Sequence, residues 1–574
     1  MVDRRRFATG IFAVCALALV ALLAPALASA RIAYFTGNQG FAGIAAPVEL
    51  STQTANPSDK VTISASTEGS PSDVAITPDG RTAYVVDDNS LTPIDVATNK
   101  AGTSITIPMF ARSIAITPDG RFAYVTSNFA SVHTVSKVDL AAGVVAAEIP
   151  VGDSLAGIAV SPDGRTAYVV SSNDGSVYPI NVATNSVGPA IAVGGFPVAI
   201  AVTPNGASAY VLDTSNEKLT RIDLATNAVV GSIPGVRGSE LAIAPNSAKA
   251  YTVGSVEVTP VDLAAGTAAA SIPTPNQSSL EDVSFLPDGS RAYMITQESQ
   301  SSLSIGLMTP IVTAGDALQP TFPLNTPFVK ALAIVPNQPP RAAFSAAPQP
   351  GKTLLPISFD AGASADTDGG SVARYEWDFG DGTIVASGGA APQHTYAKAG
   401  TYTVALTTTD NEGCSVSLVF PGQTAYCNGS SIARISHPVV VGQNICPSVK
   451  AKASTFIPKR RPGNVLPGVR VRLSTGAPAR LTVTANLIYK QGNKEASAGL
   501  GKISVLVNEW RRVRFAIPAE LRQELPIGTP VKVAVRIESQ PRNGNPCEAS
   551  VANRNLKLHV VKVFPDRVQA KRPR

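Results

Sequence analysis

Apolar and polar positions follow one another in a fixed order over the first half of the chain. A short apolar run is followed by a polar turn with proline and usually glycine, and then by a second apolar run that contains tyrosine. The copies are AITPDGRTAYV (75–85), AITPDGRFAYV (115–125), AVSPDGRTAYV (159–169), AVTPNGASAYV (201–211), AIAPNSAKAYT (242–252) and SFLPDGSRAYM (284–294). Their prolines are 40 to 44 residues apart, a period typical of stacked supersecondary units.

Each copy predicts a tight β-hairpin. Proline sets φ, aspartate suits a turn, and glycine supplies a backbone conformation closed to other residues. These turn positions are structural candidates: Pro78, Asp79, Gly80, Pro118, Asp119, Gly120, Pro162, Asp163 and Gly164. Segments such as LTPIDVATN (91–99) predict a third strand, and AAEIPVG (146–152) predicts a fourth. Four antiparallel strands in about forty residues form a propeller blade, so we interpret the repeated alanines and Tyr-Val pairs as packing residues.

The two ends of the repeat array predict how the ring closes. A seventh motif, LAIVPNQPP (332–340), lacks its Ala-Tyr-Val half, whereas RIAYFT (31–36) is that half without its beginning. Together they make one blade. We therefore predict seven blades, with strands from both ends of the array in the closing blade, which removes exposed sheet edges.

The motif SPDGRTAYVV (161–170), together with IDVATN (94–99) and its relatives, resembles the YVTN family of seven-bladed propellers found in secreted and surface-layer proteins. The resemblance covers residues 31–337 and implies an interaction platform. It does not name a ligand, because propellers support binding proteins, lyases and lactonases alike.

A second pattern begins after NQPPRAAFS (337–345). YEWDFGDGT (375–383) and HTYAKAGTYTVALTTTDNEG (394–413) resemble a PKD domain, an Ig-like sandwich, over residues 341–442. We expect Trp377 to be a core anchor, with a turn after its strand formed by Asp378, Gly380, Asp381 and Gly382. The family pattern is interrupted at 414–427.

The third region, residues 446–565 with a basic tail at 566–574, alternates apolar and polar positions and predicts another antiparallel sandwich. The expected strands include VRVRLS (469–474), RLTVTANLIY (480–489), RRVRFAI (511–517) and VKVAVRIES (531–539). Residues 450–574 hold 25 Lys and Arg against 7 Asp and Glu, a net charge of +18, although the whole chain has only +6. Either this charge binds anionic surfaces, or it only solvates one face of the sandwich.

The first thirty residues predict a cleavable signal peptide. Arg4 to Arg6 precede an apolar run from Ile11 to Ala24, and ALASA ends at Ala30. RRRF also resembles a twin-arginine signal, so either export route fits. We expect no transmembrane segment in the mature chain and a location outside the cell, at its surface or on the periplasmic side of the envelope.

Removal of the signal peptide, which contains Cys15, leaves four cysteines. In an oxidising compartment we expect them to form disulfides, and four cysteines allow three pairings. We favour Cys414 with Cys427 and Cys446 with Cys547. A zinc site is disfavoured because CxxC spacing and histidine pairs are absent from the sequence.

The sequence gives little support for a catalytic or metal-binding site. Asp366 and Asp368 in SADTDGG (364–370) form either a polar turn or, with carbonyl oxygens, a calcium site; the turn is the simpler interpretation. His133, His394, His437 and His559 are spread over three regions, and Asp95, Asp139, Asp223 and Asp262 recur at one blade position, which favours a turn role. We assign no catalytic residue, metal or cofactor.

The sequence thus predicts an all-β chain: a seven-bladed β-propeller, an Ig-like PKD β-sandwich and a C-terminal basic β-sandwich. We expect a monomeric exported binding or adhesion protein whose partner is a protein, an envelope glycan or an anionic polymer, and not nucleic acid in the cell. The alternative is a secreted propeller enzyme of the lactonase or lyase type.

Overall fold

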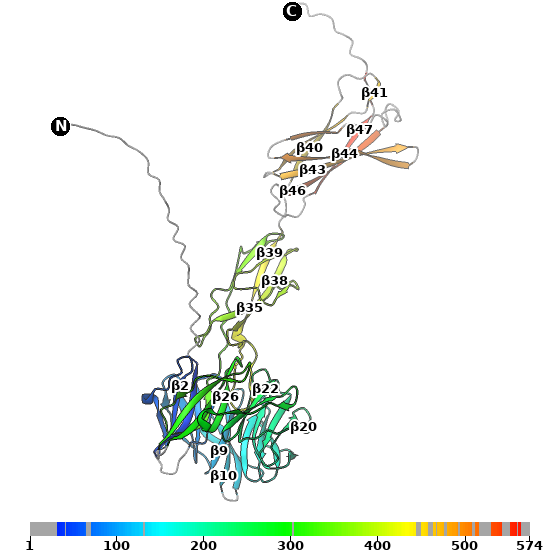
Figure 1. Ribbon diagram of the computed structural model, residues 1–574. Coiled ribbons are helices and arrows are strands. Elements are labelled where there is room, and N and C mark those ends of the chain that lie inside the picture. The colour runs from blue at the N-terminus through cyan, green and yellow to red at the C-terminus, as the bar shows by residue number, and fades with distance from the viewer. Residues whose placement is uncertain are drawn as a thin grey trace, which may run out of the picture. The chain divides into compact units, whose positions relative to one another are not determined.

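The computed structural model describes residues 31–40, 42–64, 71–129, 132–300 and 303–443, and beyond these the strands β40 to β48 (Figure 1). The predicted signal peptide lies outside the described residues. Nearly all regular structure is β-strand, as the sequence predicts. Short 3-10 helices occur at η1 (Pro57–Asp59), η2 (Pro275–Gln277) and η3 (Ser431–Ala433).

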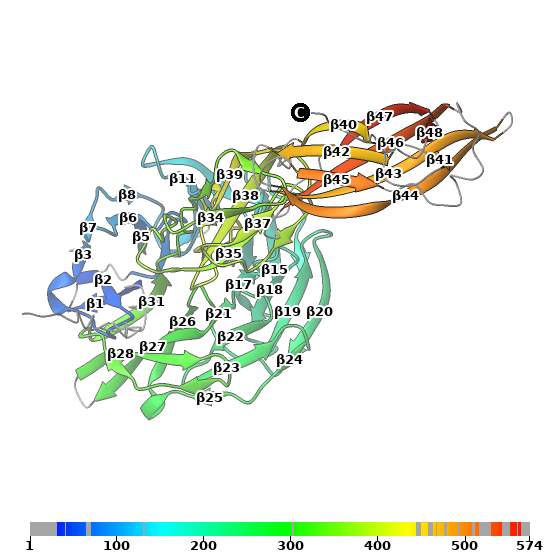
Figure 2. The ribbon, with the colours of Figure 1, turned by 90° about the horizontal axis from the view of Figure 1, so that it is seen from above.

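Residues 31–335 form seven antiparallel sheets, the blades of a propeller (Figure 2). One strand of each sheet contacts the corresponding strand of the next, and these contacts run in a closed circle. In circular order the innermost strands are β4 (Asp73–Ile76), β9 (Ala111–Ile116), β13 (Leu155–Val160), β17 (Pro197–Val202), β21 (Glu240–Ile243), β26 (Ser279–Phe285) and β31 (Phe328–Ile334). They surround the central channel.

The remaining strands of each blade follow outward from the channel. The second strands are β1 (Ile32–Gln39), β5 (Thr82–Asp87), β10 (Phe122–Phe129), β14 (Thr166–Ser171), β18 (Ser208–Asp213), β22 (Lys249–Val253) and β27 (Arg291–Gln300). The third strands are β2 (Ala42–Glu49), β6 (Ser90–Asp95), β11 (Val132–Asp139), β15 (Ser176–Asn181), β19 (Lys218–Asp223), β23 (Glu257–Asp262) and β28 (Leu303–Val312). The outer edges are β3 (Val61–Ser64), β7 (Lys100–Ala101), β8 (Ile105–Thr106), β12 (Val144–Pro150), β16 (Ile191–Ala192), β20 (Ala228–Pro234), β24 (Thr267–Ala268), β25 (Ile272–Pro273), β29 (Ala317–Leu318) and β30 (Phe322–Pro323).

The closing blade combines both ends of the propeller. Strand β1 pairs with β2 on one side and with β31 on the other, with Ala33 opposite Ile334 and Tyr34 opposite Ala333. The N-terminal strand therefore supplies the half that the last repeat lacks, as the sequence predicts.

The repeated motif is scaffold. The Ala, Tyr and Val of TAYVV are buried in every blade that carries them, where neighbouring blades pack on each other. In the first turn Thr77 donates its hydroxyl to Asp79 Oδ1 at 2.6 Å, and the same oxygen accepts the Arg81 N–H at 3.1 Å. Gly80 has φ +69°, a conformation that glycine adopts without strain. The pattern recurs at Asp119 and Asp163, so these residues shape the hairpins.

The recurring acid at the end of the third strand also has a turn role. Asp95 Oδ1 accepts hydrogen bonds from the backbone N–H and hydroxyl of Thr98, both at 2.7 Å. Asp223 does the same with Thr226, and Asp139, Asn181 and Asp262 accept backbone N–H groups two and three residues later. These acids are therefore not a converging catalytic set.

Two further sheets form the Ig-like sandwich. One contains β32 (Ser345–Ala347), β34 (Pro356–Asp360) and β37 (Gln393–Thr395). The other contains β33 (Gly351–Lys352), β39 (Arg434–Gly442), β38 (Gly400–Asp410), β35 (Val372–Asp378) and β36 (Ile384–Val385). Trp377 is fully buried against Phe344, Phe359 and Phe379, and its indole N–H donates to the Gly389 carbonyl.

The turn after Trp377 follows the predicted design. Asp378 accepts the Gly380 N–H, Asp381 accepts the Thr383 N–H, and both Gly380 and Gly382 have positive φ. A Cβ on Gly380 would lie 2.5 Å from the Thr403 carbonyl oxygen. His394 Nε2 lies 2.8 Å from Asp381 Oδ2 and its ring stacks on Phe379, which gives it a structural role.

The C-terminal region contains antiparallel sheets. The strands predicted at 469–474, 480–489 and 531–539 fall within observed ones, and the one predicted at 511–517 coincides with an observed strand as far as Phe515, beyond which its last two residues are outside the described part of the chain. Their strands are β40 (Val449–Phe456), β41 (Gly463–Val465), β42 (Gly468–Thr475), β43 (Ala479–Gln491), β44 (Lys494–Val507), β45 (Arg511–Phe515), β46 (Pro530–Pro541), β47 (Val551–His559) and β48 (Val561–Val563). The pairing orders are β40-β42-β45, β41-β48 and β44-β43-β46-β47. The predicted Cys446–Cys547 pair lies outside the described residues.

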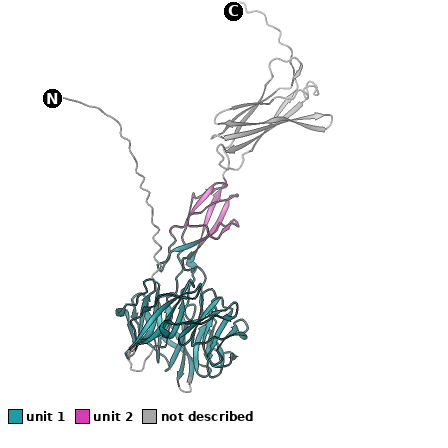
Figure 3. Cartoon of the chain, in the orientation of Figure 1, with its two compact units in different colours: residues 1–342, 364–374, 407–434 teal, residues 343–363, 375–406, 435–574 magenta. Residues whose placement is uncertain are grey.

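The chain divides into two compact units, and the division does not follow the sequence boundary (Figure 3). The propeller unit includes residues 364–374 and 407–434, although these segments are continuous in sequence with the sandwich. The second of these segments decides the shape of the central channel.

Candidate functional site

A loop between β38 and β39 lies within the propeller unit and closes one end of its channel. We call residues 414–427 the plug loop. Its backbone accepts N–H groups from the last residues of three innermost strands: Ile116 to Gln423 O at 3.2 Å, Val160 to Gly422 O at 2.7 Å and Val202 to Pro421 O at 2.9 Å. Thr424 and Tyr426 add side-chain bonds to the Ile76 N–H and the Ile243 carbonyl. The plug loop therefore binds five of the seven blades.

The sequence of the plug loop explains this fit. Cys414 and Cys427 form a disulfide, the first of the two predicted pairs, which closes the loop at its base. Phe420 is fully buried in a core cluster formed by apolar side chains of the β9 and β13 blades. Gly422 has φ +120°, and a Cβ there would lie 2.7 Å from the Ala159 Cβ. Only glycine allows so close an approach to the innermost strand at this φ.

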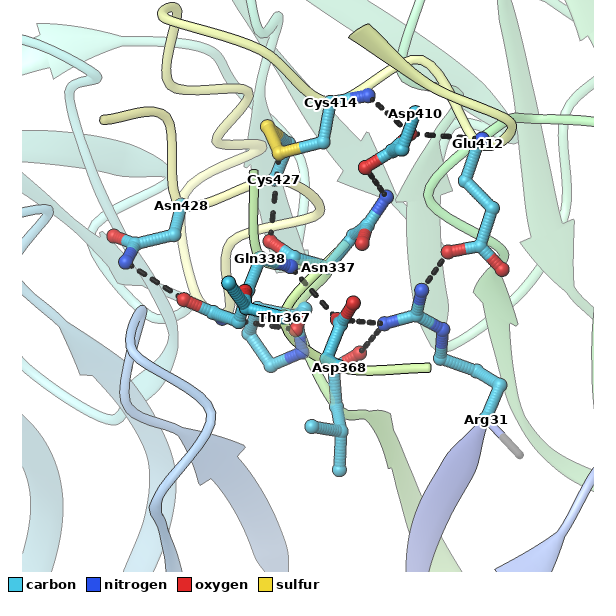
Figure 4. Close-up of polar contacts among 12 residues, drawn as sticks. Arg31, Asn337, Gln338, Thr367, Asp368, Asp410, Glu412, Cys414, Cys427 and Asn428 are labelled. Atoms are coloured by element: carbon cyan, nitrogen blue, oxygen red, sulfur yellow. Dashed lines mark hydrogen bonds and ion pairs between the residues drawn. A yellow bond between two sulfur atoms is a disulfide. The ribbon is translucent and has the colours of Figure 1, made fainter. Parts of the chain in front are cut away.

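A buried polar cluster holds the base of the plug loop and the first residue of the propeller (Figure 4). The Arg31 guanidinium is 93% buried and forms ion pairs with Asp368 and Glu412. Asp410 accepts the N–H groups of Glu412 and Cys414, and its other oxygen accepts the Asn337 amide at 3.0 Å. The predicted start of the mature chain is thus tied to the segment that carries the plug loop.

The contacts of the same cluster help to decide between a polar turn and a calcium site at Asp366 and Asp368. Asp368 Oδ2 accepts the Gln338 N–H at 2.9 Å and contacts Arg31, so a guanidinium already supplies positive charge there. Burial and the neighbouring Asp368 raise the pKa of Asp366 to about 6. In the described part of the chain, groups of three or more His, Cys, Asp or Glu arranged to hold a metal ion are absent.

On the other side of the plug loop the channel forms a cavity of about 550 Å³. Its floor contains Pro421, Gln423, Thr424 and Tyr426 of the plug loop, and its walls are the innermost strands. At the opposite end, where these strands begin, Arg112, Ser239, Glu240 and Lys330 are exposed. The cavity therefore opens to solvent at this end, which we call the open mouth.

Charged side chains occupy one arc of the cavity wall. The arc consists of β21, β26, β31, β4 and β9, which carry Glu240, Glu281, Asp282, Lys330, Asp73 and Arg112. The remaining arc, β13 and β17, presents Ala156, Gly157, Val198 and Ala201, with Ser154 and Ser172 nearby in the lining. The wall is thus charged on one side and uncharged on the other.

Two of the carboxylates tie neighbouring blades together. Asp73 Oδ2 accepts the Ser113 hydroxyl at 2.9 Å and the Ile114 N–H at 3.0 Å from β9. Asp282 Oδ2 accepts the Leu332 N–H at 2.7 Å from β31. The Glu281 carboxylate is 3.3 Å from Lys330 Nζ. For the Glu240 carboxylate, a hydrogen bond or ion pair within the described residues is absent.

The environment favours protonated carboxyl groups. Burial raises the pKa of Asp73 to about 6 and that of Asp282 to about 8. Burial, with the nearby charges of Asp282 and Asp73, raises the pKa of Glu240 well above its usual range, although part of the side chain is exposed at the open mouth. The cause is that the walls of the cavity limit the solvation of a charge there and two other carboxylates lie close by.

Large apolar side chains border the open mouth. Phe110 and Phe196 immediately precede β9 and β17, and Phe328 begins β31; each is between 43% and 51% exposed. Met109 is 42% exposed beside Phe110. Several exposed aromatic and aliphatic groups around a concave site are typical of a ligand- or partner-binding surface.

Sequence reasoning found the scaffold residues and missed these cavity residues. Pro78, Pro118 and Pro162 with their Asp-Gly partners lie in the turns at the plug end, away from the open mouth. The missed signal was variation at one aligned position, two residues before the repeated alanine. That position holds Asp73, Ser113, Gly157, Ala199, Glu240, Asp282 and Ala331 in successive blades. His133 pairs with Asp153 at 2.9 Å on the third strand of its blade, outside this set.

Comparisons with known proteins identify one part of the chain. Residues 337–419 match the PKD domain family, so this segment is a PKD domain. A stretch of 57 residues is 51% identical to collagenase ColA of Clostridium perfringens (strain 13 / Type A), which is 10% of this chain and 5% of that protein. The chain therefore covers only a small fraction of this relative.

Several solved structures are similar to the chain at low levels. Hydrazine synthase of Kuenenia stuttgartiensis is 26% identical with a TM-score of 0.35, over 38% of this chain and 68% of that one. A functionally unknown protein from Desulfotomaculum acetoxidans DSM 771 is 15% identical with a TM-score of 0.45, over 53% and 98%. Dihydro-heme d1 dehydrogenase NirN is 15% identical with a TM-score of 0.41, over 52% and 74%.

The PKD domain and the short collagenase match are typical of an extracellular or surface protein, and the disulfide fits an oxidising compartment. Among the described residues, helices long and apolar enough to span a bilayer are absent.

Proposed function

We propose that this chain is an exported binding protein in which a YVTN-type propeller is the interaction platform. The observation that carries the proposal is the blind cavity: the plug loop closes one end of the channel, and the other end opens to solvent, with the partly exposed Phe196 in its lining. A channel closed in this way retains a ligand that enters from one side. The partner is a protein or a component of the cell envelope.

The flanking regions support attachment to a surface. The PKD domain acts as a spacer, and residues 450–574 carry a net charge of +18 while the rest of the chain carries −12. A basic module outside the cell binds anionic polymers, acidic glycans or lipid head groups through its field. The two parts then have separate roles: the C-terminal region holds the protein on a surface, and the propeller binds its ligand.

Retention on purified cell envelope at increasing salt concentration tests this division. The mature chain, residues 31–574, is compared with a chain ending at residue 443, which keeps the plug loop and the cavity. We expect the full chain to be retained at low salt and released near 1 M salt, where the Debye length falls to about 3 Å. Equal retention of both chains would contradict electrostatic anchoring by the basic region.

A second control separates charge from other features of the C-terminal region. Replacement of Lys571, Arg572 and Arg574 by glutamine removes three charges from the basic tail and leaves the strands β40 to β48 intact. We expect release at a lower salt concentration. Release of this variant at an unchanged salt concentration would show that these three charges of the tail do not contribute to attachment.

A secreted propeller enzyme remains the second candidate, and one observation favours it. Raised pKa values of clustered carboxyl groups are typical of catalytic acids, and Asp282 and Glu240 share the cavity. The test is a screen with lactone and ester substrates. Turnover that disappears in both Glu240→Gln and Asp282→Asn would establish the enzyme, and turnover unchanged by both would exclude this cavity as its site.

A further inference from the structure

The two arcs of the cavity differ in chemistry, and the difference specifies a class of ligand. In the charged arc the Lys330–Glu281 pair is neutral as a whole. Asp73, Glu240 and Asp282 then face one cation, Arg112. The cavity thus has more acidic groups than basic ones. The opposite arc offers Ala156 and Val198, with Phe196 at its border, and carries no charge.

Glu240 is the residue best placed to meet a ligand. Asp73 and Asp282 use their oxygens on backbone N–H groups of the next blade, whereas the Glu240 carboxylate has neither a hydrogen bond nor an ion pair in the described part of the chain. Its side chain is exposed to the open mouth and lies close enough to Asp282 for their charges to interact.

We propose that the cavity binds a small organic ammonium, with its cationic group against Glu240 and Asp282 and its apolar body against Ala156, Val198 and Phe196. This inference rests on the proposed binding function and names the ligand class of the same site.

The size and border of the site fit such a ligand. A volume of about 550 Å³ lies within the range of about 300–1,000 Å³ found for small-molecule sites. Phe196 lies at the edge of the cavity and is 43% exposed, so its ring is available to the apolar body or, through its face, to the cation. Charge complementarity favours a cation over a neutral sugar, and the uncharged arc favours an apolar group over a hydrated one.

Binding is coupled to proton release. A cation beside Asp282 and Glu240 stabilises their ionised forms and lowers their pKa values, so protons leave as the ligand binds. The groups that face them are Asp73 from β4, Arg112 from β9, Glu281 from β26 and Lys330 from β31, with the Tyr426 phenol from the plug loop. Because the pKa of Asp282 is raised to about 8, affinity rises with pH up to that value.

Calorimetric titration of the mature chain with 2-phenylethylammonium tests the inference, with 2-phenylethanol as the neutral probe of similar shape. We expect the ammonium to bind at least about tenfold more tightly than the alcohol. Between pH 6 and pH 8 we expect its affinity to rise by up to about tenfold per pH unit for each proton released. Titrations in two buffers of different ionisation enthalpy measure that proton number directly.

Three variants locate the site. Glu240→Gln and Asp282→Asn are each expected to weaken ammonium binding by about tenfold or more. Glu240→Gln does not disturb an inter-blade bond, so it remains informative if Asp282→Asn fails to fold. Asp163→Asn is the matched control, because the blade that begins with β17 already has Asn205 at the equivalent turn position; it should bind like the parent chain.

The outcomes separate the two proposals. Equal binding of the alcohol and the ammonium, unchanged affinity in Glu240→Gln, or absence of ammonium binding would each overturn the ligand class. Retention on the cell envelope in those cases would leave the proposed binding function standing. Tight binding of a neutral disaccharide instead of the ammonium would replace this ligand class by a carbohydrate.

Discussion

Replacement of Phe420 by alanine should release the plug loop from the propeller. Phe420 is fully buried in the core cluster between the β9 and β13 blades, and it is the largest of the side chains that the loop contributes there, beside Ala425 and the partly buried Leu418. Its ring becomes exposed when the loop leaves the channel. The variant therefore loses stabilisation only in the closed state.

The size of the effect follows from the burial. Truncation of a fully buried Phe to Ala costs about 3–5 kcal/mol. Because each 1.36 kcal/mol changes an equilibrium constant tenfold, a loss of about 3 kcal/mol increases the open population by roughly a hundredfold. The disulfide keeps the loop tethered in both states.

Native-state hydrogen exchange measures this opening directly. The amides of Ile116, Val160 and Val202 donate to the plug loop and should exchange about a hundredfold faster in Phe420→Ala. Val416→Ala is the matched control, because Val416 lies in the same loop but is 42% exposed, and it should change exchange by less than about threefold. Unchanged exchange of the three amides in Phe420→Ala would refute the role of this side chain. So would equal acceleration of amides throughout the propeller, which would indicate global destabilisation.

Three other predictions concern the same unit. Arg31→Gln should lower the free energy of unfolding by about 3–5 kcal/mol in denaturant titration, because it leaves buried carboxylates uncompensated, whereas Arg81→Gln, at an exposed ion pair, should change it little. In a chain that ends at residue 443 and so lacks Cys446 and Cys547, replacing both Cys414 and Cys427 by serine should cost about 3 kcal/mol and make the melting temperature insensitive to reductant; continued sensitivity would contradict the assignment of the reductant effect to this pair. Burial raises the pKa of Asp282 to about 8, far above the value near 4 in the unfolded chain, so the folded state binds more protons and stability should fall as pH rises from about 4 to 8. The melting temperature of Asp282→Asn should change less with pH across this range than that of the parent chain. An identical pH dependence in the two chains would contradict the raised pKa of Asp282.

The propeller could be predicted because its information is local and repeated. A Pro-Asp-Gly turn specifies its own hairpin through bonds within five residues, as at Asp79. The repeat of Ala, Tyr and Val then specifies that each sheet is covered by the next. Even the closure by RIAYFT follows from counting halves of one motif, and β1 pairs with β31 accordingly.

The site could not be predicted because its information is distributed. Asp73, Glu240 and Asp282 are more than two hundred residues apart in the chain at their extremes, and only the ring brings them into one cavity. The position of the plug loop is even harder to predict, because its sequence indicates only an insertion in the PKD domain. Three of its contacts are backbone bonds to Ile116, Val160 and Val202, and such bonds depend on geometry rather than on residue type.

The plug loop also has a consequence for the order in which the protein can mature and for the ways in which it can evolve. The seven blades are complete at residue 335, but the amides of Ile116, Val160 and Val202 at the end of their channel are paired only after the chain has been made as far as the plug loop. A gene rearrangement with a break near residue 338 would transfer the propeller without the plug loop that forms the floor of its cavity. We therefore expect the blades and the plug loop to be exchanged together in evolution, whereas the rest of the PKD domain is freer to vary.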